Sequence, residues 1–420
     1  MSDDLVVGLD IGTSKVCAII GELNEIGELE ITGVGTSPST GLRKGVVVNI
    51  DAVVASISGA IEAAEIMSSR VVNNCWTGIG SHIESVHSHG AATVTLKREQ
   101  REVARDDIER TLELARAINF SMDRQILDVI PQTYTVDDNQ GIRDPIGMTG
   151  MRLECEVNII TCSTTSAQNL IKCVNRTGFH VEDLILKTLA AGRAVLTSEE
   201  KDLGCILIDL GGGTTNVLVY HQGAPCFTAS IPAGGSQVSS DISIVKNVST
   251  DTAEQIKIEN GCCWEPILEQ GEDIIVPGMG GRSPFPIARA EICAIIRPRM
   301  EETFDMVKNR LSAFRISKPL GAGIVLTGGG SKLLGAADLA AEVFRMPVRI
   351  GAPLPLKGLS SEFRGPEYAT AVGLVLEAND RRIARGISSG GGEHAVVENT
   401  SPKFFGIFSK LKNWVQNEFF

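Results

Sequence analysis

The chain has 420 residues, of which 43% are hydrophobic, so it can bury a large core and fold as two or more lobes. Its 44 glycines and its aromatic content of only 5% favour a turn-rich α/β protein over a β-sandwich or a coiled coil. The formal net charge of −12 argues against a general nucleic-acid binder, which needs a broad basic face, so we expect no nucleic-acid partner.

The N-terminal segment MSDDLVVGLDIG has no positive region followed by a cleavable apolar stretch, so we expect no signal peptide. The longest apolar runs reach about half of the ~20 residues that a membrane span needs. Ten scattered cysteines form no CxxC pair, which favours buried, reduced thiols. Together these features predict a cytosolic protein that reaches a membrane only by peripheral attachment.

Two segments about half a chain apart follow one plan. VVGLDIGTSKVCAIIG (6–21) and CILIDLGGGTTNVLVY (205–220) each read as an apolar strand ending in Asp, a glycine turn and a second apolar strand. One such motif alone is weak evidence, since many ordinary hairpins contain glycine. Two aligned copies predict a duplicated domain with a cleft between the halves.

The two predicted turns have the chemistry of a phosphate site. Glycines allow close backbone approach, and neighbouring hydroxyl and ammonium groups add donors. The predicted phosphate-binding residues are Gly12, Thr13, Ser14 and Lys15 in the first copy and Gly211, Gly212, Gly213, Thr214 and Thr215 in the second. Asp10 and Asp209 also face the phosphates, which is tolerable only with a cation between them, so we expect these carboxylates to hold Mg²⁺ largely through water.

The segment between these copies contains a charged, strongly helical stretch (99–118), followed by a β-rich part marked by proline and glycine. Just before it, SHIESVHSHG (81–90) contains His82, His87 and His89. A zinc site is conceivable because two of these histidines share one strand face, but no fourth ligand is evident. Exposed strand histidines are the favoured interpretation.

Two further motifs suit a nucleoside. In STDTAEQIKIENG (249–261), Glu254 and Lys257 share one face of a short helix and form either a surface ion pair or a grip on ribose and adenine. In GAGIVLTGGGSKLLGAADLAAEVF (321–344), a strand leads through a glycine turn into a helix, which suits a purine ring. The residues expected at this turn are Gly328, Gly329, Gly330 and Ser331. No P-loop motif and no GxGxxG dinucleotide motif occurs.

The C-terminal region changes character twice. From Asn379 the chain is polar and rich in Gly and Ser, which predicts a flexible linker, assigned to 381–402. Residues 403–420 then predict an amphipathic helix with an apolar arc of about 140° and lysines on the other side. The apolar arc consists of Phe404, Ile407, Phe408, Leu411, Trp414, Val415 and Phe419. An anionic membrane surface is the favoured target, and a protein groove is the alternative.

These motifs, in this order, resemble the actin/heat-shock-chaperone/sugar-kinase ATPase superfamily. Within it, the chain resembles the FtsA family of bacterial cell-division proteins, from Leu5 to about Leu376 and again in the tail. The most specific segments are VIPQTYTVDDNQGIRDPIGMTGMRLECEVNIITC (129–162), AGIVLTGGGSKLLG, VRIGAPLPLKGL (348–359) and EYATAVGLVL (367–376).

The resemblance implies a two-lobed actin-like ATPase fold of duplicated ribonuclease-H-like domains with an FtsA-type inserted subdomain. The implied parts are a first lobe (5–84 and 162–202), its insertion (85–161), a second lobe (203–228 and 300–380) and its insertion (229–299). It implies ATP and Mg²⁺ as cofactors.

The implied role is at the division site, on the cytoplasmic face of the inner membrane. The expected partners are further copies of the chain, the C-terminal peptide of tubulin-like FtsZ, an anionic membrane, and downstream division proteins that bind 85–161. Arg299 and Glu302 match residues that grip the FtsZ peptide, on a predicted helix (297–311) with Pro298 near its start; a merely solvated helix face is the alternative. An MreB-like filament protein and a small-molecule kinase remain alternative functions.

Hydrolysis is expected to be slow or absent, and no catalytic residue is assigned. Active hydrolases of the superfamily often place a Glu where LILKTLAAGRAVLT (184–197) has Lys187, with Thr188 at the following proline position. A lysine cannot take a proton from water as a carboxylate can, and losing a positioned base removes ~10²–10⁴-fold in rate.

Overall fold

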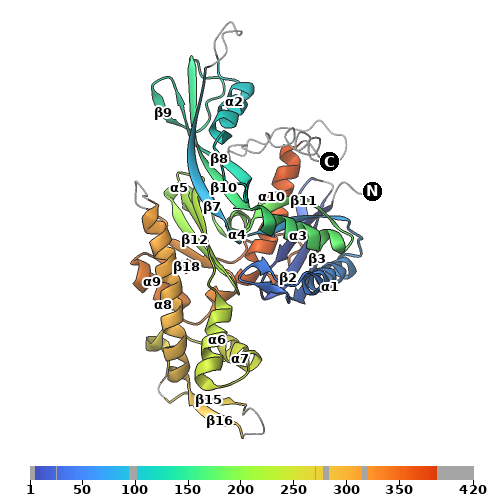
Figure 1. The fold of residues 1–420 in the computed structure, drawn as a ribbon, viewed down its shortest axis with the longest axis vertical. Helices are drawn as coiled ribbons and strands as arrows, with labels where there is room; N and C mark the ends of the chain where they lie inside the picture. The colour runs from blue at the N-terminus through green and yellow to red at the C-terminus, as the bar shows by residue number, and fades with distance from the viewer. Residues whose placement is uncertain are drawn as a thin grey trace.

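The computed structural model describes residues 5–24, 26–93, 102–269, 271–277, 283–314 and 320–385. Within these ranges, helices pack around three larger sheets, ordered β11-β6-β1-β2-β3, β7-β10-β8-β9 and β14-β13-β12-β17-β18 (Figure 1). The molecule is elongated, with the four-stranded sheet and α2 at one end and β15 and β16 at the other (Figure 1). The predicted α/β class is confirmed.

The first sheet forms around the N-terminal hairpin. Its strands are β1 (Leu5–Ile11), β2 (Lys15–Leu23), β3 (Leu29–Pro38), β6 (Asn74–Ile79) and β11 (His180–Leu186). β1, β2 and β3 pair antiparallel, whereas β6 lies parallel to both β1 and β11. Its helices are α1 (Ile50–Ser68), α3 (Thr164–Arg176), α4 (Lys187–Val195) and α10 (Ala369–Ala384). These elements bury one continuous aliphatic core.

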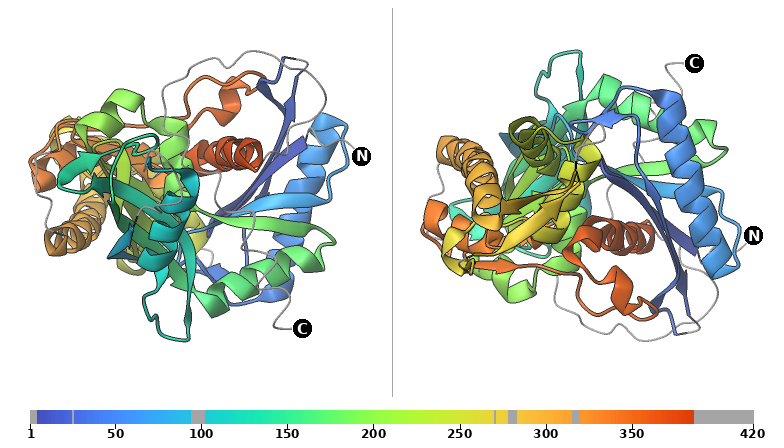
Figure 2. Two further views of the ribbon diagram at one scale, coloured as in Figure 1. Left: turned by 90° about the horizontal axis from the view of Figure 1, so that it is seen from above. Right: turned by 90° about the horizontal axis from the view of Figure 1, so that it is seen from below.

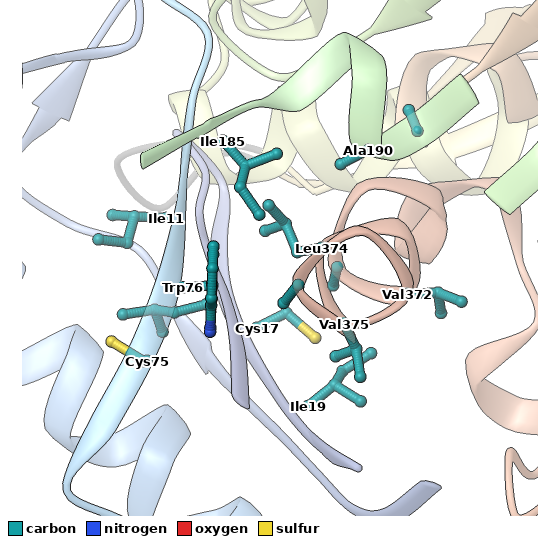
Figure 3. Packing of buried hydrophobic residues seen from close by; sticks show 14 of the residues in the cluster. Ile11, Cys17, Ile19, Cys75, Trp76, Ile185, Ala190, Val372, Leu374 and Val375 are labelled. Carbon is teal, nitrogen blue, oxygen red and sulfur yellow. The ribbon is translucent and has the colours of Figure 1, made fainter. Parts of the chain in front are cut away.

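Helix α10 packs on the first sheet beside α4 (Figure 2). Leu374 and Val375 point toward β1 and β2 in the core, near Cys17 and Trp76 (Figure 3). Where the two helices cross, a Cβ on Gly373 would lie 1.7 Å from the Ala190 carbonyl oxygen, so only glycine permits this approach.

The position of α10 corrects two sequence-based boundaries. The segment 300–380 was expected in the second lobe, but its last helix packs on the first sheet. The linker was expected from 381, but α10 continues to Ala384, and Arg381 and Arg382 are buried. The predicted start of the linker at 381 is wrong because ion pairs and hydrogen bonds allow the polar side chains of this segment to be buried. Composition alone does not reveal such partners.

The second sheet forms around the second hairpin. Its strands are β12 (Cys205–Leu210), β13 (Thr215–His221), β14 (Ala224–Ile231), β17 (Ile324–Thr327) and β18 (Val348–Ile350). Its associated helices are α6 (Gly235–Lys246), α7 (Thr250–Asn260), α8 (Arg289–Ala313) and α9 (Ala336–Phe344), with a β-ribbon of β15 (Asp273–Val276) and β16 (Phe285–Ala288). They share a second core.

Helix α8 begins earlier than the sequence predicted. Pro298 was expected near a helix start, but it lies inside a 25-residue helix that starts at Arg289. The expected boundary at 299/300 between insertion and lobe therefore falls within one continuous helix. Proline usually marks a first helical turn, and here tertiary packing overrides that preference.

The third sheet and α2 (Arg105–Arg116) bury a separate core. In the sequence they lie between β6 and α3. The strands of this sheet are β7 (Glu84–Thr93), β8 (Arg124–Val136), β9 (Asn139–Ile142) and β10 (Arg152–Ser163). Gln132 on β8 donates to the Pro225 carbonyl at 2.9 Å, so this unit contacts the second sheet at β14. The remaining elements are β4 (Leu42–Arg43), β5 (Val46–Val47), α5 (Ser198–Leu203) and four short 3₁₀ turns.

All ten cysteines are buried free thiols, as predicted. Within the ranges described, no helix is long and apolar enough to cross a membrane. Residues 386–420 lie outside those ranges. They comprise the remainder of the predicted linker and the whole predicted amphipathic segment.

Candidate functional site

The two predicted hairpins are present and geometrically equivalent. In the first, Asp10 pairs with Cys17 in register, and in the second Asp209 pairs with Asn216. Each turn is closed by the same backbone hydrogen bond, from the amide of Gly12 to Lys15 O at 3.0 Å and from that of Gly211 to Thr214 O at 2.9 Å. The sequence repeat therefore corresponds to a structural repeat.

The two turns face each other directly. A Cβ on Gly213 would lie 2.6 Å from Thr13 Oγ1 and 3.0 Å from Thr13 Cβ, and a Cβ on Gly212 would lie 2.0 Å from Ser14 Oγ. Side chains on these glycines would push the turns apart. The structure thus brings the hydroxyl residues of one predicted phosphate turn against the glycines of the other.

The second turn is supported by the N-terminus of α6, which sequence reasoning missed. The amide of Gly235 donates to Gly211 O at 3.0 Å, and that of Ser236 to Gly212 O at 2.8 Å. The available signal was the AGGS sequence (233–236), which follows an apolar strand. The Thr215 hydroxyl is buried and donates to Ala233 O at 2.9 Å, so it fixes this loop and does not serve as a free donor.

The Glu254–Lys257 pair on α7 contacts the N-terminal part of α6. Lys257 Nζ lies 2.7 Å from Glu254 Oε2 and also donates to Gly235 O at 3.1 Å. Ser239 on α6 bonds to both side chains. The pair therefore belongs to the neighbourhood of the second turn and is more than an isolated surface ion pair.

The third glycine turn lies against the end of β12. A Cβ on Gly328 would lie 2.2 Å from Asp209 Oδ1, and one on Gly330 would lie 2.9 Å from Leu210 Cβ. Gly328 also has a φ of +79°, which favours glycine. Ser331 is buried, and its hydroxyl donates to Gly328 O at 2.7 Å. A Cβ on Gly329 would meet only Glu367, at an ordinary contact distance of 3.7 Å.

Asp209 is buried at the centre of this arrangement. Desolvation and the negative charge of Asp10 raise the pKa of Asp209 from 3.8 to about 6, while Lys187 and Thr370 act in the opposite direction. Thr370 Oγ1 lies 3.5 Å from the carboxylate. Burial therefore favours the protonated form of this carboxyl group.

Asp10 has a different partner. Lys187 Nζ lies 2.7 Å from Asp10 Oδ1, and both side chains are less than one-sixth exposed. Lys15, expected at the phosphates, places its ammonium 3.3 Å from the ring centroid of Tyr368. Burial lowers the pKa of Lys15, while Cys17, Asp10 and Glu367 raise it.

These residues fit a phosphorylated ligand. Glycine backbone and hydroxyl groups of both turns converge, and the first amides of α6 hold the carbonyls of the second turn in place. Asn216 Oδ1, beside Thr214, is buried and accepts no hydrogen bond among the residues described, which leaves an acceptor for a donor such as a metal-bound water. The fit to a metal is less simple, because Asp10 already contacts a cation.

The remaining candidates lie elsewhere. Arg299 on α8 makes a bidentate pair with Asp241 on α6, at 2.6 and 3.0 Å, and also contacts Glu302. His82, His87 and His89 are exposed, as favoured from the sequence, and no cluster of metal-ligating side chains occurs in the part of the chain described. The seven apolar tail residues lie outside it.

Known proteins of similar fold or sequence place the chain in a family. The family model "Cell division protein FtsA" matches residues 206–373, and "SHS2 domain inserted in FTSA" matches 80–161. The cell division protein FtsA of Pseudomonas aeruginosa is 42% identical over 420 residues, covering 100% of this chain and 99% of that protein. That of Escherichia coli K12 is 35% identical, covering 99% and 98%.

Two solved structures show the predicted actin-like fold. A PilM–PilN type IV pilus biogenesis complex has a TM-score of 0.63 at 18% identity, covering 89% of this chain and 98% of that chain. MreB5 of Spiroplasma citri bound to ADP has a TM-score of 0.55 at 14% identity, covering 93% and 100%. The resemblance to MreB is thus one of fold, whereas the sequence relationship over the whole length is to FtsA. The chain belongs to the FtsA family of cell division proteins.

Proposed function

We propose that this chain binds ATP between the two facing turns and assembles with further copies of itself at the division site. The observation that carries the proposal is the direct opposition of Gly212 and Gly213 to Ser14 and Thr13. Two such turns, one from each sheet, are a means of holding a chain of phosphates between two lobes. Asp209 is the carboxylate that would hold Mg²⁺ through water when it accompanies ATP, whereas Asp10, the other predicted ligand, already contacts Lys187 Nζ at 2.7 Å.

The adenosine end of the ligand would lie toward the glycine turn at Gly328–Ser331 and the Glu254–Lys257 pair. Both features border the second hairpin: Gly328 lies against Asp209, and Lys257 contacts Gly235. The MreB5 structure of the same fold is an ADP complex, which supports a nucleotide of this class.

Slow hydrolysis follows from Lys187. The position that would carry a water-orienting acid instead carries an ammonium group bound to Asp10 Oδ1 and to Ile11 O, each at 2.7 Å. An ammonium donor cannot act as a general base. Nucleotide would therefore act as a switch that favours the closed lobes and polymer contacts.

The tail is proposed as the membrane attachment. Burial of seven apolar side chains would give a gross ~10–15 kcal/mol, and ordering the segment at roughly 1 kcal/mol or more per residue would cancel most of it. One tail would therefore bind weakly, and several tails on one oligomer would hold the assembly at the inner face of the membrane. At the membrane the assembly would tether FtsZ. Arg299 and Glu302 would contact the C-terminal peptide of FtsZ.

Liposome co-sedimentation tests this function. The full chain should sediment with anionic vesicles more strongly with ATP than without, and a chain ending at Pro402 should remain in the supernatant. Trp414→Glu should abolish sedimentation without changing ATP binding, whereas Asn413→Glu on the polar side is the matched control. Unchanged sedimentation of Trp414→Glu would refute the membrane role.

A further inference from the structure

The side chain of Lys187 lies against two glycines and ends at Asp10. It is the first residue of α4, directly after β11. Its aliphatic stem passes the end of β6, where a Cβ on Gly78 would lie 3.0 Å from Lys187 Cγ and one on Gly80 would lie 3.2 Å from Cδ. Side chains at these two glycines would crowd the stem, so the sheet leaves room for a long residue at 187.

The ammonium group ends at the carboxylate expected to face the metal. Lys187 Nζ lies 2.7 Å from Asp10 Oδ1 and donates to Ile11 O at 2.7 Å, just before the first phosphate turn. The Lys187 side chain is 14% exposed and that of Asp10 13%. The contact with Asp10 Oδ1 is an ion pair without hydrogen-bond geometry, whereas the contact with Ile11 O is a hydrogen bond.

The ion pair between Lys187 and Asp10 changes the charge that a phosphate or a metal ion would meet at this site. A carboxylate beside phosphates repels them unless a cation lies between, and Mg²⁺ ordinarily provides that charge. Here a positive charge already contacts Asp10, and it is covalently part of the chain. A hydrated Mg²⁺ that approached Asp10 Oδ1 would meet the ammonium group at short range and be repelled by it.

We propose that Lys187 acts as a built-in cation at Asp10, taking the role of Mg²⁺ at that carboxylate, so that nucleotide binding by this chain depends only weakly on Mg²⁺. The inference rests on the proposed nucleotide site. Lys187 is a positioning residue in this account, because it acts on the phosphates through the charge of Asp10.

The test compares nucleotide affinity with and without the metal. A fluorescent ATP analogue is titrated into the full chain with excess Mg²⁺ and again with EDTA, for the parent protein, Lys187→Met and Lys187→Ala. The parent Kd should change by less than about threefold, and both variants should lose more than about tenfold on metal removal. Lys246→Ala is the matched control, since Lys246 is 15% exposed and pairs with Glu291, and it should behave as the parent.

Manganese gives a readout without nucleotide. Electron paramagnetic resonance should detect Mn²⁺ bound to Lys187→Met and little bound to the parent, because removal of the ammonium frees Asp10. If Lys187→Ala does not fold, Lys187→Met keeps an unbranched stem beside Gly78 and Gly80 and still decides the question.

The outcomes separate the two proposals. A purely structural ion pair would lower the melting temperature of the variants and leave the parent as dependent on Mg²⁺ as they are, which overturns this inference alone. No nucleotide binding by the parent under either condition overturns the proposed function together with this inference. A weakly metal-dependent parent beside strongly dependent variants supports both.

Discussion

Arg381, near the end of α10, donates to the carboxylate of Asp128 on β8 at 2.8 Å, across 253 residues of sequence. The same guanidinium donates to Glu377 at 3.0 Å, and the three side chains are almost completely buried. Burial raises the pKa of Glu377, while Arg381 acts in the opposite direction. One arginine therefore contacts two buried acids, one on its own helix and one on a strand of the inserted sheet.

Arg381→Met should be strongly destabilising. The change leaves Asp128 and Glu377 buried without their cation, and breaking a buried pair on one side costs about 3–5 kcal/mol. Urea unfolding followed by circular dichroism measures this loss. Arg70→Met is the control, because the Arg70–Glu22 pair is half exposed on the arginine side and should contribute less than about 1 kcal/mol. Equal effects of the two changes would contradict the assigned role of Arg381.

Gly373→Ala should destabilise the contact between α10 and α4. Its new methyl group would lie 1.7 Å from Ala190 O, and relief requires movement of a helix, which costs about 1–3 kcal/mol or more. Gly192→Ala on α4 meets its nearest atoms only at 3.4 Å, so it should be neutral or stabilising through helix propensity. Thermal melting of both variants checks the contrast, and a similar loss in both would argue against this crossing.

Gly213→Ala should weaken nucleotide binding while leaving the fold intact. The added Cβ lies 2.6 Å from Thr13 Oγ1, so the turns must separate by a small distance. A strain of about 1–3 kcal/mol in the closed arrangement corresponds to a loss of roughly 5- to 150-fold in affinity. Gly321→Ala meets no atom within 3.5 Å and is the control for the same titration. Parent-like affinity in Gly213→Ala would contradict close apposition of the turns in the bound state.

Asp209 should make stability fall as the pH rises. Its pKa is raised to about 6 by burial, so the native state holds the proton more tightly than the unfolded chain. The stabilising effect is present below the ordinary value of 3.8 and is lost as the pH rises through about 6. Between pH 5 and pH 7, Asp209→Asn should gain about 1 kcal/mol relative to the parent. Urea unfolding at both pH values measures this, and a constant difference would contradict the assignment.

Composition favoured the α/β class, the repeat of the two Asp-Gly segments predicted both hairpins, and the separate segment 321–344 predicted the glycine turn at Gly328. These features depend on local rules: apolar runs end at Asp, and glycine marks turns. The opposition of Gly213 to Thr13 could not be predicted in the same way. It depends on how two sheets pack, which no local pattern specifies.

The errors have a common physical origin. Residues 381–385 look like a linker because Arg381, Arg382 and Arg385 are charged, yet each has a partner contributed by a distant segment. Pro298 looks like a helix start, yet α8 continues through it. The pairing of Lys187 with Asp10 was missed for the same reason, because only the charge of Lys187 and not its partner is visible in sequence.

The anchoring of α10 also determines how a mechanical load enters the protein. A force applied through residues beyond 385 would act first on this helix. Arg382 on α10 donates to Leu5 O at the start of β1, the strand that carries Asp10 near its other end. Arg381 connects the same helix to Asp128 on β8. Tension at the C-terminus would thus be divided between the strand leading to the first phosphate turn and the inserted sheet.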